Sequence, residues 1–174
     1  LHTKYLFDKL KKISFSIFLN DEFEDTILKE IQKIIDGNIV YDNKQRDFIY
    51  SKNEKAISIK NTASGIKSFG ILQLLLENDI LNQNSILIID EPENHLHPKW
   101  QLKYAKVLVT LAKNGVKILI ASHSPYMIEA IKRYSDLENL EESTNFYLAE
   151  NSIIESRDRL EDIFKTLEEP FEIF

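Results

Sequence analysis

Two short stretches of the chain are almost continuously apolar and predict the centre of the fold. They cover residues 86–89 and 116–121, and such runs are typical of strands that are buried on both faces of a parallel sheet. Between them, the apolar residues within 100–111 recur at helical spacing, and Pro98 and Gly115 suit the start and the end of that helix. Strand, helix and strand form a βαβ unit, so we expect parallel strands with a right-handed crossover.

Further helices are predicted on both sides of this unit. One apolar face indicates a helix over residues 22–35, another over 66–76 and a terminal one over 158–168. A short helix should open at Ser124, followed by a polar surface segment over 135–143 that could be loop or helix. These helices would flank the sheet of an α/β fold.

Short β-like pieces complete the predicted pattern. Those over residues 38–60 are separated by turn residues and indicate a small antiparallel meander, and a last hairpin is expected over 145–155. Residues 4–19 fit a helix or a strand. We expect one domain over residues 1–174, with a helix and the antiparallel β element in 1–60 and the remaining motifs in 61–174.

Composition narrows the classes of protein. The 174 residues suffice for one domain with a real core, and the net charge of −6 argues against bulk nucleic-acid binding by this piece alone. Cysteine is absent, which excludes disulfides and thiolate sites and fits a reducing, cytoplasmic compartment. Apolar runs stay well short of the ~18 residues of a membrane span. The chain starts with Leu1 rather than Met, so we expect a fragment of a longer protein.

Candidate chemistry lies where the two predicted strands end. Asp90 and Glu91 follow the first strand, and Ser122 and His123 follow the second. Because parallel strands end at the same edge of a sheet, these side chains should converge there. Asp90 would hold Mg²⁺, Glu91 would orient or deprotonate a water for attack on a γ-phosphate, and His123 would contact that phosphate or the water. The alternative is a strand that merely ends in solvated acids.

These segments resemble motifs of a known family. SILIIDEP resembles the Walker B segment of ABC-type ATPases, and ILIASHSP resembles their switch-histidine segment. The continuation ENHLHP resembles the RecF-like and OLD-like prokaryotic ATPases, often labelled AAA-family. The resemblance, over roughly residues 38–170, implies a partial P-loop NTPase fold of the ABC-ATPase-like kind. It also implies that Glu93 to His97 form a D-loop, with Asn94 and His97 at a dimer interface or with His97 as a polar cap on the next helix.

A third segment, NTASGIKSFG, resembles the family's signature. Only Gly65 matches the common form Leu-Ser-Gly-Gly-Gln outright, because Ala63 occupies the serine place and Ser64 follows it. A Ser-Gly turn at a helix start offers free amide protons to a phosphate, and Lys67 adds positive charge. The resemblance implies that Ser64, Gly65 and Lys67 bind ATP held by the opposite protomer. Which hydroxyl would meet the phosphate stays open, as does the alternative of a plain helix start.

A phosphate-cradling loop of the form G-x-x-x-x-G-K followed by Ser or Thr is missing from the sequence. Gly65 and Gly70 have the first spacing, but Ile71 and Leu72 follow instead of Lys and Ser. Truncation of an N-terminal P-loop lobe is the simplest explanation, ahead of a naturally split or degenerate protein. The chain alone should therefore hydrolyse ATP negligibly.

The resemblance implies that the longer protein binds ATP and Mg²⁺ and closes as a homodimer. It further implies a nucleotide-driven clamp in DNA repair or anti-phage defence, with a nuclease partner or DNA and without a membrane. Two other classes stay open. One is a non-catalytic module that dimerises or docks a partner. The other is a metallohydrolase built from one carboxylate and three histidines, namely Asp90, His95, His97 and His123.

Overall fold

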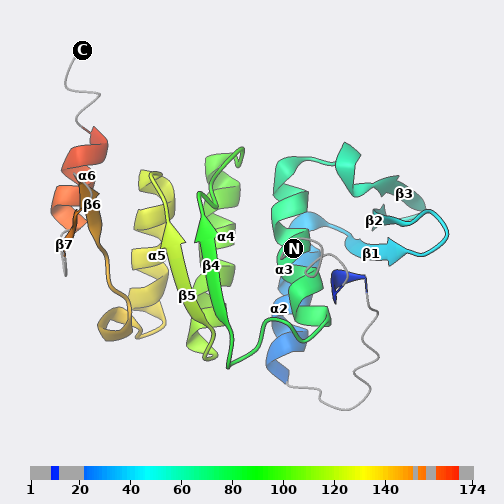
Figure 1. Ribbon diagram of the computed structural model, residues 1–174, viewed down its shortest axis with the longest axis horizontal. Helices are drawn as coiled ribbons and strands as arrows, with labels where there is room; N and C mark the ends of the chain where they lie inside the picture. Colours follow the sequence, from blue (N-terminus) through cyan, green and yellow to red (C-terminus); the bar gives the residue numbers. More distant parts are fainter. Residues whose placement is uncertain (1–8, 12–21, 151–152, 156–159, 169–174) are drawn as a thin grey trace.

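The computed structural model describes residues 9–11, 22–150, 153–155 and 160–168, which form helices and short strands (Figure 1). The helices are α2 (Glu22–Ile35), α3 (Ser64–Glu77), α4 (Pro98–Lys113), α5 (Pro125–Leu137) and α6 (Leu160–Glu168), with 3-10 turns η1 (Ile59–Asn61) and η2 (Glu141–Ser143). The strands are β1 (Asn38–Asp42), β2 (Asp47–Lys52), β3 (Lys55–Ser58), β4 (Ile86–Asp90), β5 (Lys117–Ala121), β6 (Leu148–Glu150) and β7 (Ile153–Glu155).

The predicted βαβ unit is confirmed. Strands β4 and β5 pair in parallel, with Ile86 opposite Lys117 and Asp90 opposite Ala121. Helix α4 connects them and ends before Gly115, whose φ of +95° is readily adopted only by glycine. The carboxyl ends of both strands therefore lie at one edge of the sheet.

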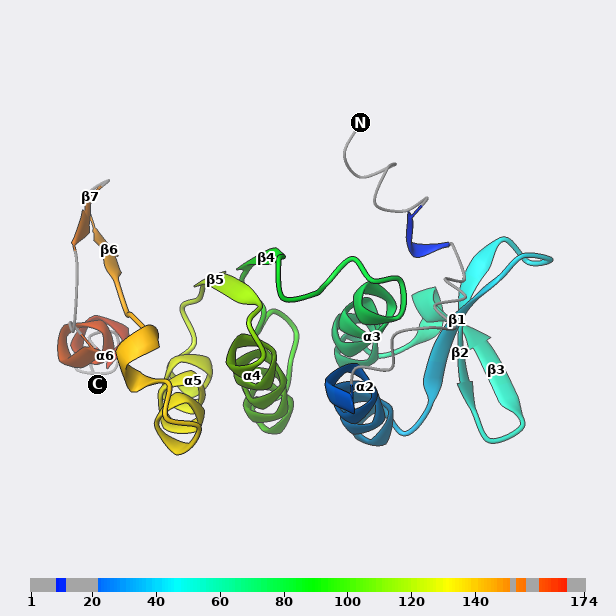
Figure 2. The same cartoon turned by 90° about the horizontal axis from the view of Figure 1, so that it is seen from below.

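The prediction that these strands are buried on both faces is wrong for the described part of the chain. Helices α4 and α5 cover one face of the sheet, and no described element covers the other (Figure 2). Side chains alternate between the two faces of a strand, so every second apolar residue is left in solvent. Ile86, Ile88 and Leu119 are 66%, 70% and 58% exposed.

The predicted meander is also confirmed. Strands β1, β2 and β3 form an antiparallel sheet in that order. Strand β1 is the edge strand beside α3, and the buried Gln73 of α3 makes hydrogen bonds with the backbone of β1. The amide of Ile39 donates to Gln73 Oε1 at 3.3 Å, and Gln73 Nε2 donates to the carbonyl of Ile39 at 3.0 Å. The helix thus supplies the pairing that another strand would give.

One hydrophobic cluster joins the meander and the βαβ unit through α2, α3 and α4. At its centre, the ring of Phe69 meets Tyr104 edge-on at 5.1 Å and Trp100 at 5.6 Å between ring centroids. The proposed division at residue 60 stays a prediction. Among the described helices, none has the length and apolarity needed to cross a membrane.

Two helices differ from the prediction by more than a residue at one end. Helix α3 begins at Ser64, two residues before the predicted start, and α5 continues to Leu137, so part of the polar segment is helical. The last hairpin and the terminal helix are present as β6, β7 and α6. The ambiguous segment 4–19 lies outside the described residues except for 9–11.

Candidate functional site

The chain leaves the sheet at Glu91 through an uncommon backbone conformation. The amide of Glu91 donates to the carbonyl of Ala121 at 2.8 Å, which extends the parallel ladder by one bond. Glu91 then adopts a φ of +48°, in the left-handed region that few non-glycine residues occupy. This turn separates the exposed side chain of Asp90, at the end of β4, from the loop that follows.

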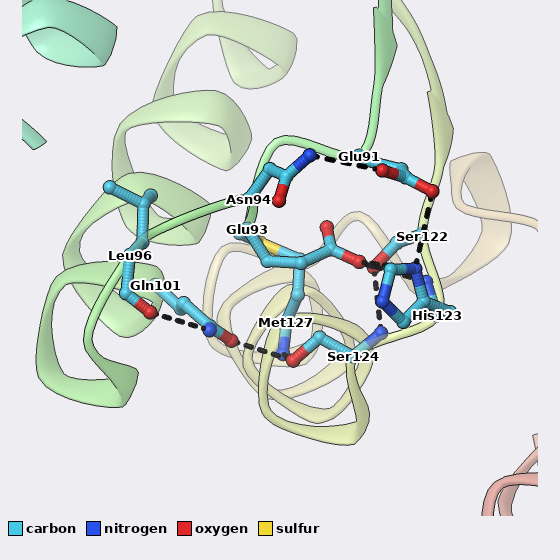
Figure 3. A network of polar contacts seen from close by, with 9 residues as sticks. All are labelled: Glu91, Glu93, Asn94, Leu96, Gln101, Ser122, His123, Ser124 and Met127. Carbon is cyan, nitrogen blue, oxygen red and sulfur yellow. Dashed lines mark hydrogen bonds and ion pairs between the residues drawn. The ribbon is translucent and has the colours of Figure 1, made fainter. Parts of the chain in front are cut away.

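Glu91 and His123 meet at this edge, as the parallel pairing of their strands predicts. His123 Nδ1 lies 3.6 Å from Glu91 Oε1, and the two side chains are 70% and 48% exposed (Figure 3). On the other side, Asn94 Nδ2 donates to Glu91 Oε2 at 3.1 Å. The Glu91 carboxylate is therefore held from two directions and remains open to solvent. Its role as a base stays a prediction.

Glu93 is the residue whose position the sequence reasoning missed. It was assigned only to the D-loop, but its side chain is buried behind Glu91, with 5% exposed. Glu93 Oε1 accepts from Ser122 Oγ and from the amide of His123, both at 2.9 Å, and lies 3.4 Å from His123 Nδ1 (Figure 3). The available signal was a second glutamate after Pro92, within reach of the Ser-His pair once the strands are parallel.

The rest of the loop is built by local contacts. The amide of Leu96 donates to the carbonyl of Glu93 at 2.8 Å, and the Leu96 side chain is buried. His95 has a φ of +61°. His97 Nδ1 accepts from the amide of Lys99 at 3.2 Å, so His97 caps α4 as one of its predicted roles required. Asn94, for which the family resemblance implies a dimer contact, donates a hydrogen bond to Glu91 in this chain, and the dimer contact stays a prediction.

The signature segment lies against this same loop. Ser64 Oγ donates to the carbonyl of His95 at 2.7 Å. Gly65 is buried, and a Cβ added there would lie 2.5 Å from Trp100 Cε3. Lys67 Nζ donates to the carbonyl of Lys60 at 3.0 Å. Helix α3 starts after Ala63 without a side-chain cap, so its first amides keep their donor capacity for a ligand.

The side chains at the sheet edge suit Mg²⁺ better than zinc. Mg²⁺ takes one or two protein carboxylates together with phosphate and water, and Asp90 and Glu91 supply such oxygen donors. Zinc sites instead gather three or four His, Cys or carboxylate ligands. Within the described residues, no group of three or more His, Asp or Glu side chains is placed to hold a metal ion. The set of Asp90 and the three histidines is not assembled in this part of the chain.

Comparison with known proteins gives consistent matches. Residues 3–128 match the model of an AAA ATPase domain. The chain is 30% identical to protein ea59 of Escherichia phage lambda, over 67% of the chain and 21% of that protein. It is 31% identical to the Old nuclease of Escherichia phage P2, over 48% of the chain and 14% of that protein. It is 33% identical to a probable ATPase of retron Vc95 from Vibrio cholerae serotype O1 biovar El Tor, over 49% of the chain and 18% of that protein.

The chain thus spans at most 21% of the length of these three relatives. A solved structure supports the fold over a larger share. It comes from work on ATP-driven dimerization and DNA-stimulated activation of SMC ATPases, and it superposes with a TM-score of 0.55 over 85% of this chain and 92% of that one, at 12% identity. This likeness confirms the expected α/β fold of the P-loop NTPase, ABC-like kind.

Proposed function

Because the chain belongs to the AAA ATPase domain family, in its OLD-like and RecF-like group, we propose that it supplies the hydrolytic edge of an ATP site. The observation that carries the proposal is the pair Glu91 and His123, 3.6 Å apart at the carboxyl edge of two parallel strands. Ligands of open α/β sheets bind at this edge. An acid and an imidazole that are both exposed there can act on a phosphate and a water.

Each residue takes a distinct role in this proposal. Glu91 orients or deprotonates the attacking water, because its carboxylate is exposed and steadied by Asn94. His123 contacts the γ-phosphate or the water. Asp90 holds Mg²⁺, directly or through water, and the ion when bound would neutralise phosphate charge.

ATP would be gripped from a second protomer by the start of α3. Ser64, Gly65 and Lys67 lie at the positive end of this helix, where uncapped amides favour an anion. Loop 91–97 lies directly beside them through the Ser64 to His95 hydrogen bond. A homodimer contact made by the exposed Asn94 and His97 would therefore also place the α3 start near the partner.

A P-loop lobe would complete the site by covering the open face of β4 and β5. The exposed side chains of Ile86, Ile88 and Leu119 form an apolar surface on that face. Burying apolar area contributes about 25 cal/mol per Å². A lobe that packs there would bring its phosphate-binding loop to the same sheet as Asp90 and Glu91.

The biological role we propose is a clamp that ATP binding closes and hydrolysis releases. Relatives that carry the names Old nuclease and retron Vc95 probable ATPase support a role in anti-phage defence or DNA repair. A nuclease or DNA is the partner that such a clamp would hold.

The direct test of the catalytic role is Glu91→Gln in the full-length ATPase. The amide keeps the size of the side chain and its acceptor for Asn94, so ATP binding should persist. Loss of the base should lower the turnover rate by about 10²-fold or more. Binding is measured with a fluorescent nucleotide and turnover by phosphate release.

Glu54→Gln, in the exposed turn between β2 and β3, is the matched control and should leave both quantities unchanged. Unchanged turnover in Glu91→Gln would remove Glu91 from the role of base. Turnover that is absent in the wild-type protein, together with self-association that needs no ATP, would favour the non-catalytic docking module instead.

A further inference from the structure

Glu93 is a buried carboxylate that the proposed roles leave without a task. Only 5% of its side chain is exposed, and one of its oxygens, Oε2, is buried without a hydrogen-bond partner within the described residues. Burying a carboxylate is costly unless donors surround it. Within the part of the chain that the structure describes, the hydrogen bonds that the Glu93 side chain accepts come from the dipeptide Ser122-His123. Glu93 therefore links the loop that follows β4 to that dipeptide.

The contacts of Glu93 fix both the backbone and the ring of His123. Oε1 accepts from the amide of His123 and from Ser122 Oγ, each at 2.9 Å. The same oxygen is 3.4 Å from His123 Nδ1 (Figure 3). Without Glu93, the residues that follow β5 would lose these contacts with the loop that follows β4.

The orientation of the ring selects which nitrogen can meet a ligand. Nδ1 faces two carboxylates, Glu93 at 3.4 Å and Glu91 at 3.6 Å. A carboxylate only accepts hydrogen bonds, so the proton of the neutral ring belongs on Nδ1. Nε2 then carries the lone pair, and it becomes a donor only when the ring is charged. The side chain is 70% exposed, which leaves Nε2 accessible.

A second contact keeps the two segments in register. Gln101 of α4 donates from Nε2 to the carbonyl of Leu96 at 3.0 Å and accepts from Ser124 Oγ at 2.6 Å. Ser124 in turn caps α5. Loop 91–97 and segment 122–124 are thus joined at both ends (Figure 3), by Glu93 near the site and by Gln101 behind it.

We infer that Glu93 is a positioning residue that clamps Ser122-His123 to loop 91–97 and holds His123 as the Nδ1–H tautomer, so that Nε2 is presented to the phosphate or the attacking water. The ligand in this inference rests on the proposed function, whereas the clamp and the tautomer concern this chain alone. The two glutamates then have different roles. The exposed Glu91 acts on the attacking water, and the buried Glu93 orients His123.

The experiment uses the 174-residue chain without nucleotide, so its outcome does not depend on ATP hydrolysis. Nitrogen-15 NMR of the imidazoles at alkaline pH identifies the tautomer of His123, whose resonances are assigned by their loss in His123→Gln. The wild-type protein should show the Nδ1–H form. An Nε2–H form in the wild-type protein would overturn the inference before any other variant is made.

Two matched substitutions separate the roles of the carboxylates. Glu93→Met removes the acceptor at similar length, so the tautomer should shift toward the Nε2–H form that free histidine prefers in water. The amide hydrogen of His123 should exchange about tenfold faster or more. Glu91→Met leaves the hydrogen bond from the His123 amide to Glu93 intact. This variant should therefore keep both the Nδ1–H tautomer and the exchange rate of the wild-type protein.

Glu93→Gln covers the case in which Glu93→Met does not fold, because its amide oxygen can still accept from Ser122 and His123. Tautomer and exchange rate should stay close to wild type in this variant. The inference is overturned if folded Glu93→Met behaves as wild type, or if Glu91→Met has the same effect as Glu93→Met.

Discussion

At the scale of single residues, the loop after β4 is held in a conformation that its residues do not favour by themselves. Glu91 and His95 both have positive φ values, +48° and +61°. Such conformations cost about 1–3 kcal/mol each in residues other than glycine. The hydrogen bonds of Asn94, Leu96 and Glu93 in this loop offset that cost. The loop therefore fixes the position of the Glu91 carboxylate, as the role proposed for it requires.

Gly65 offers a prediction at this scale. A Cβ at this position would lie 2.5 Å from Trp100 Cε3, and the ring is held by Phe69. Gly65→Ala should therefore destabilise the chain by about 1–2 kcal/mol, since overpacking outweighs the better helix propensity of alanine. Urea unfolding of the two proteins measures the difference.

A double-mutant cycle identifies the cause. In a Trp100→Leu background the ring is gone, so Gly65→Ala should be neutral or slightly stabilising. The same cost in both backgrounds would show that contact with Trp100 is not what requires a glycine there.

At the scale of elements, helix α3 links three parts of the molecule. Its first residue bonds the loop that follows β4, its middle packs on α4 through Phe69, and Gln73 pairs with the edge of β1. Gln73 Nε2 also donates to Asn38 Oδ1 and, at 2.8 Å, to Glu77 Oε1. Helix α3 therefore connects the loop that follows β4 to the meander.

Gln73→Leu tests this link. The buried Ile39 amide and carbonyl would lose their partner, which should cost about 2 kcal/mol and expose the Ile39 amide to exchange. Burial raises the pKa of Glu77, and the hydrogen bond from Gln73 counteracts that effect. Without the bond, the charged form of Glu77 is less favoured in the folded state.

The stability lost in Gln73→Leu should therefore be larger at neutral pH than below pH 4.5, the ordinary pKa of Glu77, where the group is protonated in both states. Gln83→Leu, at an exposed position, is the control and should change stability by less than about 0.5 kcal/mol. Equal unfolding midpoints for the two variants would contradict the link.

At the scale of the whole molecule, sequence patterns predicted where the helices and strands lie, but not which faces of the strands are buried. Helical and strand periodicity located α2, the meander and the βαβ unit, because these patterns express local geometry and side-chain direction. The exposure of Ile88 could not be read from the sequence, since an apolar strand looks the same whether its second cover is present or not.

The candidate site could be predicted from the sequence only in part. Parallel pairing of β4 and β5 was enough to bring Glu91 and His123 together. The Glu93 side chain is buried in a loop that begins with a left-handed backbone conformation at Glu91. No local sequence rule indicates that conformation for a glutamate. The contact between Ser64 and His95 joins residues 31 positions apart and follows from packing of α3 on α4.

The central claim is that Asp90, Glu91 and His123 form part of an ATP site that a P-loop lobe must complete. The most direct measurement is ATP turnover by the purified 174-residue chain, alone and joined to the P-loop lobe of its ATPase. We expect negligible turnover by the chain alone, and turnover that appears with the lobe and disappears again with Glu91→Gln. Robust hydrolysis by the chain alone would contradict the claim.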